Sequence, residues 1–234
     1  MKMFLWLLFL ISAVAGYSIS SIKINFNGLD KAHSGDHHGA IEVYSRAIEL
    51  NPQYADAYIN RGVSRARLGD HRGAIQDYNI AIELRSENAD AYFNRGVSKN
   101  QQRDYRAAIQ DFNSAIELKP QDAMAFLNRG TSKNELGDYR GAIQDFNRAI
   151  ELEPEYAIAF YNRGVSKALL GDERGAIQDY DKAIAIDPRY ADAYINRGLS
   201  KLSLDNLDSG CLDFSKAGEL GDDEAYEIIG IYCR

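Results

Sequence analysis

The sequence predicts an all-α protein built from an array of antiparallel helix pairs. A unit of 34 residues recurs along most of the chain, and the tripeptide Asn-Arg-Gly marks it at residues 60–62, 94–96, 128–130, 162–164 and 196–198. All four prolines share one position of the unit: Pro52, Pro120, Pro154 and Pro188. Repetition at this interval is typical of solenoid proteins, in which each unit packs on its neighbours.

The first half of the unit is predicted to be a helix that ends at a specified turn. In the copy Ala123–Leu136, Phe126 precedes Gly130 by four residues, so both lie on one helix face and another helix can approach closely there. Gly137 then supplies a left-handed turn residue, and Asp138 can accept hydrogen bonds from the free N–H groups that begin a second helix.

The second half of the unit is predicted to be an amphipathic helix. Its apolar residues fall at i, i+1, i+4, i+7 and i+8, which is the stripe of a half-buried helix: Ala142, Ile143, Phe146, Ala149 and Ile150. Pro154 lacks an N–H and cannot continue this helix. The chain is therefore expected to reverse before the next copy.

These features resemble the tetratricopeptide repeat (TPR) family, including its exported bacterial members. The resemblance implies a right-handed superhelical solenoid of antiparallel helix pairs. It rests on four columns: Gly62, Gly96, Gly130, Gly164 and Gly198; Ala74, Ala108, Ala142 and Ala176; Tyr78, Phe112, Phe146 and Tyr180; Ala81, Ala115, Ala149 and Ala183. Two columns depart from the family pattern: the Arg after each repeated Asn, and the cationic column of Arg65, Lys99, Lys133, Lys167 and Lys201, whose stems are expected to bury their methylene groups.

The array is expected to occupy residues 22–234. A degenerate first repeat covers 21–54, and regular copies follow at 55–88, 89–122, 123–156, 157–190 and 191–220. Residues 222–233 begin with three acids and are predicted to form a single cap helix.

The N-terminal segment has the pattern of a secretory signal peptide. Lys2 precedes an apolar run over residues 3–11, and Ala13-Val14-Ala15 provides a small-residue cleavage site before Gly16. We therefore expect residues 1–15 to be a signal peptide; an uncleaved anchor extending to about residue 22 and a buried core helix are the alternatives. The first two readings place the repeats outside the cytoplasm, in the periplasm, secreted or anchored to a membrane.

Composition and motifs argue against several functions. A net charge of −7 and a pI near 5.2 disfavour binding to a phosphate backbone, so no nucleic-acid partner is expected. The repeated serines have no recurring histidine beside them, and we expect no catalytic residues, no enzyme activity and no cofactor. His33, His37 and His38 cluster at one turn, which could ligate a metal but is expected to be a solvated turn instead.

The expected functional surface is the concave face that first helices line in the resembled family. It would carry a ladder of five asparagines, whose amides can pair with the backbone of an extended peptide or only support the repeat. The candidate groove residues are Asn60, Asn94, Asn128, Asn162, Asn196, Phe93, Leu127, Thr131 and Tyr161. On the same face Asp56, Asp90, Glu135 and Asp192 outnumber Arg67, so we expect a neutral or basic partner with apolar anchors.

A structural ion pair is predicted in each of five repeats. An acid follows each repeated Arg by 16 residues, which brings the two side chains onto facing helices across the turn: Arg61 and Asp77, Arg95 and Asp111, Arg129 and Asp145, Arg163 and Asp179, Arg197 and Asp213. If these pairs are partly exposed, each should contribute roughly 0 to 1 kcal/mol.

The two cysteines are predicted to form a disulfide. Cys211 lies about 10 residues before the reversal at residues 220–221 and Cys233 about 12 after it, so an antiparallel hairpin sets them nearly level. Two buried free thiols are the alternative.

The sequence as a whole therefore favours a non-catalytic peptide- or protein-binding scaffold that acts outside the cytoplasm. Two other functions stay open: a structural module for self-assembly, and an assembly factor for a membrane complex.

Overall fold

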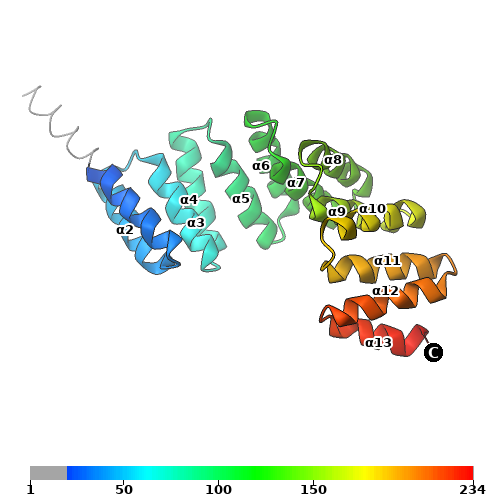
Figure 1. Ribbon diagram of the computed structural model, residues 1–234. Coiled ribbons are helices and arrows are strands. Elements are labelled where there is room, and N and C mark those ends of the chain that lie inside the picture. Colours follow the sequence, from blue (N-terminus) through cyan, green and yellow to red (C-terminus); the bar gives the residue numbers. More distant parts are fainter. Residues whose placement is uncertain (1–19, 234) are drawn as a thin grey trace, which may run out of the picture. The chain divides into compact units, whose positions relative to one another are not determined.

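A computed structural model describes residues 20–233, which form thirteen helices and no strand (Figure 1). The predicted all-α fold of consecutive helix pairs is confirmed. The expected signal peptide lies outside the described residues. The chain divides into two compact units that meet in sequence at Lys119 and Pro120. Within the described residues, no helix is both long and apolar enough to cross a membrane.

Unit 1, which ends at Lys119, holds the first three repeats. A helix covers residues 20–33, so the described part of this helix begins within one residue of the expected repeat boundary at 21. Each later helix packs on the one before it, and α3 also contacts α5, so successive first helices are neighbours. The helices are α2 (His37–Leu50), α3 (Ala55–Arg67), α4 (His71–Leu84), α5 (Ala89–Gln101) and α6 (Tyr105–Leu118).

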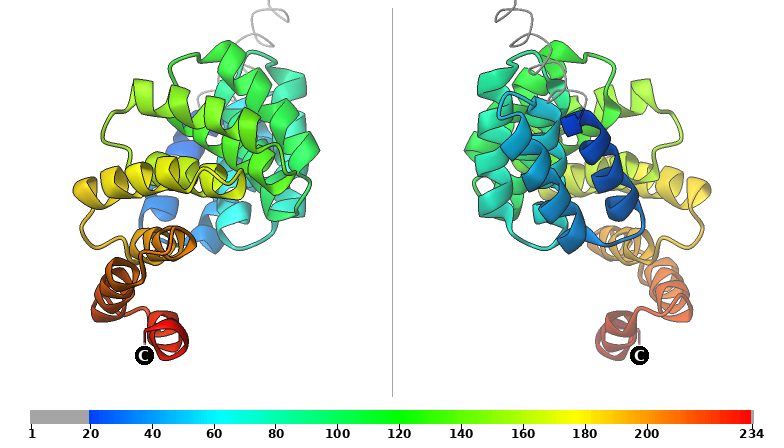
Figure 2. Two further views of the ribbon diagram at one scale, coloured as in Figure 1. Left: turned by 90° about the vertical axis from the view of Figure 1, so that its right-hand side faces the viewer. Right: turned by 90° about the vertical axis from the view of Figure 1, so that its left-hand side faces the viewer.

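Unit 2, from Pro120 onwards, holds the remaining repeats and the cap helix. Its last helices, from amber to red in Figure 2, pack in chain order. First helices again contact one another, α7 with α9 and α9 with α11. The helices are α7 (Ala123–Glu135), α8 (Tyr139–Leu152), α9 (Ala157–Leu169), α10 (Glu173–Ile186), α11 (Ala191–Ser203), α12 (Leu207–Glu219) and α13 (Asp223–Tyr232).

The close approach expected at the repeated glycine is present. An added Cβ at Gly130 would lie 2.7 Å from the ring of Phe146, which is fully buried. The same contact joins Gly62 to Tyr78 in unit 1, at 2.6 Å. The glycine therefore lets the aromatic ring of the second helix fill the space beside the first helix, and this contact makes the core of each pair.

The turns also follow the sequence signals. Gly137 has φ +78°, and the side chain of Asp138 accepts a hydrogen bond from the Gly141 N–H at 3.0 Å. In the third repeat Arg103 takes the glycine's place with φ +61°, a left-handed conformation that costs about 1 kcal/mol for a residue with a Cβ. The array thus keeps its turn geometry even where the preferred residue is missing.

Candidate functional site

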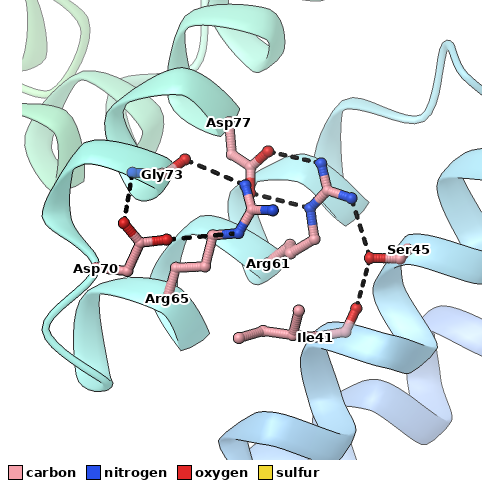
Figure 3. Close-up of polar contacts among 7 residues, drawn as sticks. All are labelled: Ile41, Ser45, Arg61, Arg65, Asp70, Gly73 and Asp77. Atoms are coloured by element: carbon pink, nitrogen blue, oxygen red, sulfur yellow. Dashed lines mark hydrogen bonds and ion pairs between the residues drawn. The ribbon is translucent and has the colours of Figure 1, made fainter.

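Each repeated Asp is buried between two cations from the facing first helix. In unit 1, Arg61 donates from Nε and Nη2 to the two oxygens of Asp77, at 3.0 and 2.7 Å (Figure 3). Arg65 donates from Nη1 to Asp77 Oδ2 at 2.8 Å. Asp77 is only 1 % exposed, so its site excludes most water. The two cations neutralise its charge there through charge-assisted hydrogen bonds.

The same arrangement recurs in the other four regular repeats. Every expected Arg–Asp pair is in contact, at 2.5 to 2.7 Å. The second cation comes from the column that we expected only to bury its methylene groups. Its charged ends instead reach the buried carboxylate at 2.7 to 2.8 Å, in Arg65, Lys99, Lys133, Lys167 and Lys201. The arginine also lies over the first-helix aromatic ring in each repeat, 5.3 to 5.6 Å from its centroid.

The first repeat shows that these charges belong together. It has Asn27 where later repeats have Arg, and Val43 where they have the buried Asp. Lys31, at the position of the second cation, pairs with the exposed Asp36 at 2.8 Å. The arginine and its acid are therefore lost as a set, because a buried charge without its partner is strongly destabilising.

The arginine also connects adjacent repeats. Arg61 Nη1 donates to Ser45 Oγ of the preceding second helix at 3.0 Å, and Arg163 Nη1 donates to Asn147 Oδ1 at 2.6 Å. Within each unit, the Asn-Arg-Gly segment is thus held by its own second helix and by the second helix of the preceding repeat. This rigid framework sets the position of the asparagine that precedes each arginine.

The five asparagines fall into two groups. Three amides have partners inside the chain: Asn60 donates to Asn25 Oδ1, Asn128 to the Met124 carbonyl, and Asn196 to Tyr161 OH and the Asp192 carbonyl. The side chains of Asn94 and Asn162 have no hydrogen-bond partner among residues 20–233. The ladder is therefore partly structural. Each unit has one asparagine whose side chain has no partner among residues 20–233 and can bind a ligand, Asn94 in unit 1 and Asn162 in unit 2.

The remaining groove residues differ in how much of each is accessible. Leu127 is 8 % exposed, so its side chain belongs to the core and offers little surface to a ligand. Phe93 is half-buried against the ring of Phe112, with centroids 5.9 Å apart. Thr131 donates to the Leu127 carbonyl, in its own helix, at 3.0 Å.

Tyr161 forms part of an aromatic cluster in unit 2. Its ring lies 4.8 Å from that of Tyr190 and 6.0 Å from that of Tyr180. Burial raises the pKa of Tyr161 to about 12, and the charge of Asp192 acts in the same direction. The phenol therefore stays protonated at neutral pH and holds the amide of Asn196.

Two first helices of unit 2, α7 and α9, expose apolar side chains where unit 1 and α11 have acids. Met124 and Ile158 occupy the column of Asp56 and Asp90, and both are exposed, as is Leu199. The two unit 1 acids form ion pairs with Arg85 and Lys119, which the sequence did not indicate. The negative charge that the sequence predicts on this face is therefore largely neutralised in unit 1.

A cavity lies between α9, α10 and α11 of unit 2, beside one asparagine of the ladder. Its volume is about 230 Å³. Four aliphatic residues, two serines, an acid, a tyrosine and an asparagine surround it: Val165, Ala168, Leu169, Leu199, Ser200, Ser203, Glu173, Tyr180 and Asn196. Such a site suits an apolar side chain whose backbone runs past the amide.

The C-terminal cysteines are bonded in the structure. Cys211 in α12 and Cys233 after α13 have Cα atoms 5.8 Å apart, within the range that a disulfide requires. Ala225 is the only buried residue of α13. The cap helix is thus held by this bond and a small apolar contact.

The turn histidines do not assemble into a metal centre. Among residues 20–233 there is no group of three or more His, Cys, Asp or Glu side chains arranged to hold a metal ion. The Nδ1 atoms of His37 and His71 are buried and lack a hydrogen-bond partner among those residues.

Several solved structures have a fold similar to that of this chain, and one of them is described as a TPR protein. YrrB, described as a TPR protein with an unusual peptide-binding site, is 26% identical, with 80% of this chain and 98% of YrrB covered and a TM-score of 0.68. PilF of Pseudomonas aeruginosa is 20% identical, with 92% and 99% covered and a TM-score of 0.78. MamA is 24% identical, with 70% and 96% covered and a TM-score of 0.66. No curated protein matches the chain.

Models of two protein families match the sequence itself. The one described as TPR repeat matches residues 31–69, 132–171 and 168–204, and the one described as tetratricopeptide repeat matches residues 61–123. Together with the helix pairs and their glycine–aromatic contacts, these matches show that the chain belongs to the tetratricopeptide repeat family.

Proposed function

We propose that the protein is a non-catalytic scaffold that binds an extended peptide segment of another protein on the surface of its first helices. The observation that carries the proposal is the amide of Asn162, which is free among the described residues and projects from a helix fixed by the Arg163–Asp179 pair. An amide can donate to a peptide C=O and accept from a peptide N–H. The similarity to YrrB, a TPR protein with an unusual peptide-binding site, supports the same role.

The first helices of unit 2 supply apolar contacts around that amide. Ile158 and Leu169 in α9 and Leu199 in α11 are exposed, and the cavity beside Asn196 provides a recess between these helices. Hydrogen bonds to the peptide backbone would give affinity, while the recess would select one aliphatic side chain.

The preferred partner is neutral or basic with apolar anchors, and this preference arises mainly in unit 2. Glu135 and Asp192 have no ion pair within residues 20–233, and Glu173 lines the cavity. In unit 1 the acids Asp56 and Asp90 are already paired. A basic segment would therefore be attracted to the α7–α9–α11 surface.

We also propose that the protein acts outside the cytoplasm, in the periplasm, secreted or anchored to a membrane. Lys2, the apolar run and Ala13-Val14-Ala15 support export, and the Cys211–Cys233 bond suits an oxidising compartment. Mass spectrometry of the native protein should find an N-terminus near Gly16. A soluble cytoplasmic protein that keeps Met1 would contradict export.

Self-assembly, or a role in assembling a membrane complex, is the second candidate. The end of unit 2 exposes apolar side chains that a stack of repeats would normally cover: Leu207, Leu212, Tyr226, Ile231 and Tyr232. Leu212 is the most exposed of these side chains, at 72 %. Terminal repeats usually present a polar outer face, so this surface favours contact with another protein or a second copy.

Light scattering combined with a peptide array separates the two candidates. A scaffold should be monomeric and should select neutral or basic peptides with aliphatic residues. A defined oligomer that selects no peptide would support self-assembly instead. Selection dominated by acidic peptides would contradict the proposed partner chemistry.

A further inference from the structure

A second cavity lies in unit 1, at the position equivalent to the cavity in unit 2 but four repeats earlier. It is an open recess formed by the helix over residues 20–33 together with α2 and α3, and its volume is about 480 Å³. It is lined by Leu29, Ala32, His33, Gly35, His37, Tyr44, Asn60, Val63, Ser64 and Arg67. Both cavities have Ala in one wall, Ala32 here and Ala168 in unit 2.

The alanine leaves room in this wall of the cavity. Between α7 and α9 the same column holds Asn134, whose Oδ1 accepts a hydrogen bond from Ser166 Oγ at 2.8 Å. Asn134 fills that space and satisfies the serine. With Ala32 in its place, the corresponding Ser64 is left beside an open cavity.

Three exchanges give the unit 1 cavity a different charge from its unit 2 counterpart. Where unit 2 has Leu169, Glu173 and Ser203, unit 1 has His33, His37 and Arg67. The only acid of the lining is replaced by an imidazole, and a guanidinium is added. The unit 1 cavity is therefore lined by cationic and donor groups, whereas the unit 2 cavity is acidic and aliphatic.

Several of these polar groups have no partner within residues 20–233. Ser64 is 1 % exposed, yet its Oγ makes no hydrogen bond. The buried Nδ1 of His37 makes none either, a state it shares with His71 one repeat later, and the exposed Arg67 forms no ion pair in the same part of the chain. Buried polar atoms are nearly always hydrogen-bonded, so the unpaired Ser64 Oγ beside this cavity indicates that a ligand completes its contacts.

We propose that this cavity binds the carboxylate of an acidic side chain of the protein partner. A carboxylate only accepts hydrogen bonds, so it fits a site made of a guanidinium, two imidazoles and a hydroxyl. The inference rests on the proposed peptide-binding function. It adds that a partner of neutral or basic overall charge carries one Asp or Glu that contacts the first two repeats.

The test uses a capped glutamate, N-acetyl-glutamate-N-methylamide, titrated into the full chain and followed by amide NMR shifts. Saturable shifts are expected in α2, α3 and the turn at residues 33–36. Capped glutamine should bind about tenfold more weakly, because it lacks the charge that Arg67 recognises.

Variants that copy the unit 2 lining provide the matched comparison. Arg67→Ser and His33→Leu should each weaken capped glutamate binding by about fivefold to tenfold, while Arg72→Ser, an exposed change on α4, should leave it unchanged. Equal binding of glutamate and glutamine, no effect of Arg67→Ser, or binding of inorganic phosphate without glutamate would each overturn the assignment.

This titration also separates the inference from the function on which it rests. A capped amino acid needs no groove, so failure here combined with peptide binding at Asn162 would refute only the carboxylate site. Loss of all peptide binding with intact glutamate binding would refute the scaffold function.

Discussion

Arg163 Nη2 and Asp179 Oδ1 lie 2.5 Å apart, and Asp179 is almost completely buried. Nε of the same arginine reaches the other carboxylate oxygen at 2.9 Å, so the pair is bidentate. Our sequence-based magnitude of roughly 0 to 1 kcal/mol applied to a partly exposed pair. Because this pair is buried, removing one partner leaves an uncompensated buried charge, and the loss of stability is larger than for an exposed pair.

We predict that Arg163→Ala and Asp179→Ala each lower the free energy of unfolding by roughly 3 kcal/mol, because each leaves a buried charge with an incomplete set of partners. A double-mutant cycle in urea should show clear coupling between the two. The exposed pair Arg148–Glu151 is the matched control and should change stability by less than about 0.5 kcal/mol. Additive effects at residues 163 and 179 would contradict the pairing.

The same glycine-to-alanine change should have opposite effects at two helical sites. At Gly130 the new methyl group would lie 2.7 Å from the Phe146 ring, so we predict a loss of roughly 1 to 3 kcal/mol from overpacking. At Gly230 nothing lies within 4 Å, and alanine should stabilise α13 by up to about 1 kcal/mol. Thermal unfolding of the two variants measures both signs; equal effects would show that the glycine–aromatic contact does not determine the cost.

Stability should fall at alkaline pH. Burial raises the pKa of Tyr44 to about 12, whereas the unfolded chain titrates near 10. The contribution of this tyrosine is therefore fully present below pH 10 and is lost as the pH rises towards 12, because the unfolded state ionises first. Phenylalanine occupies the same position in other repeats, so Tyr44→Phe should fold normally and show a smaller loss of stability between pH 10 and 11.5. An identical pH dependence in the variant would contradict the assignment.

The disulfide should stabilise the cap helix. Reduction, or replacement of both cysteines by serine, should cost about 3 kcal/mol on the chain-entropy model for a loop of 22 residues. Since α13 buries only Ala225, faster amide exchange should appear first in residues 223–232. Two free thiols per unfolded, unreduced chain would show that the bond is absent.

The sequence predicted the helix pairs well because the local signals agree with the packing. The glycine of each first helix, the aromatic residue of the second and the Asp after each turn are all fixed by contacts within one repeat. These contacts recur every 34 residues, so one copy explains the others. Cys211 and Cys233 could also be related, because a single hairpin separates them.

Features that depend on the space between helices were not predictable in the same way. The second cation was missed although Arg61 and Arg65 lie four residues apart and share a helix face, a spacing that could have shown that both reach Asp77. Leu127 was placed in the groove, but its side chain is buried, as is Ile59, which packs in the cluster that contains Ala91. The cavities are lined by Ala32 and Ala168, and such spaces appear only when the neighbouring helix is in place.

The affinity of a selected peptide for the Asn162→Ala variant tests the central claim most directly. The change removes a side chain that has no partner within residues 20–233, so it should leave stability unaltered while weakening peptide binding about tenfold. Gln178→Ala, an exposed change on the second helix α10, is the control and should bind like the unaltered protein. Equal affinities of all three proteins would contradict a peptide-binding surface on the first helices.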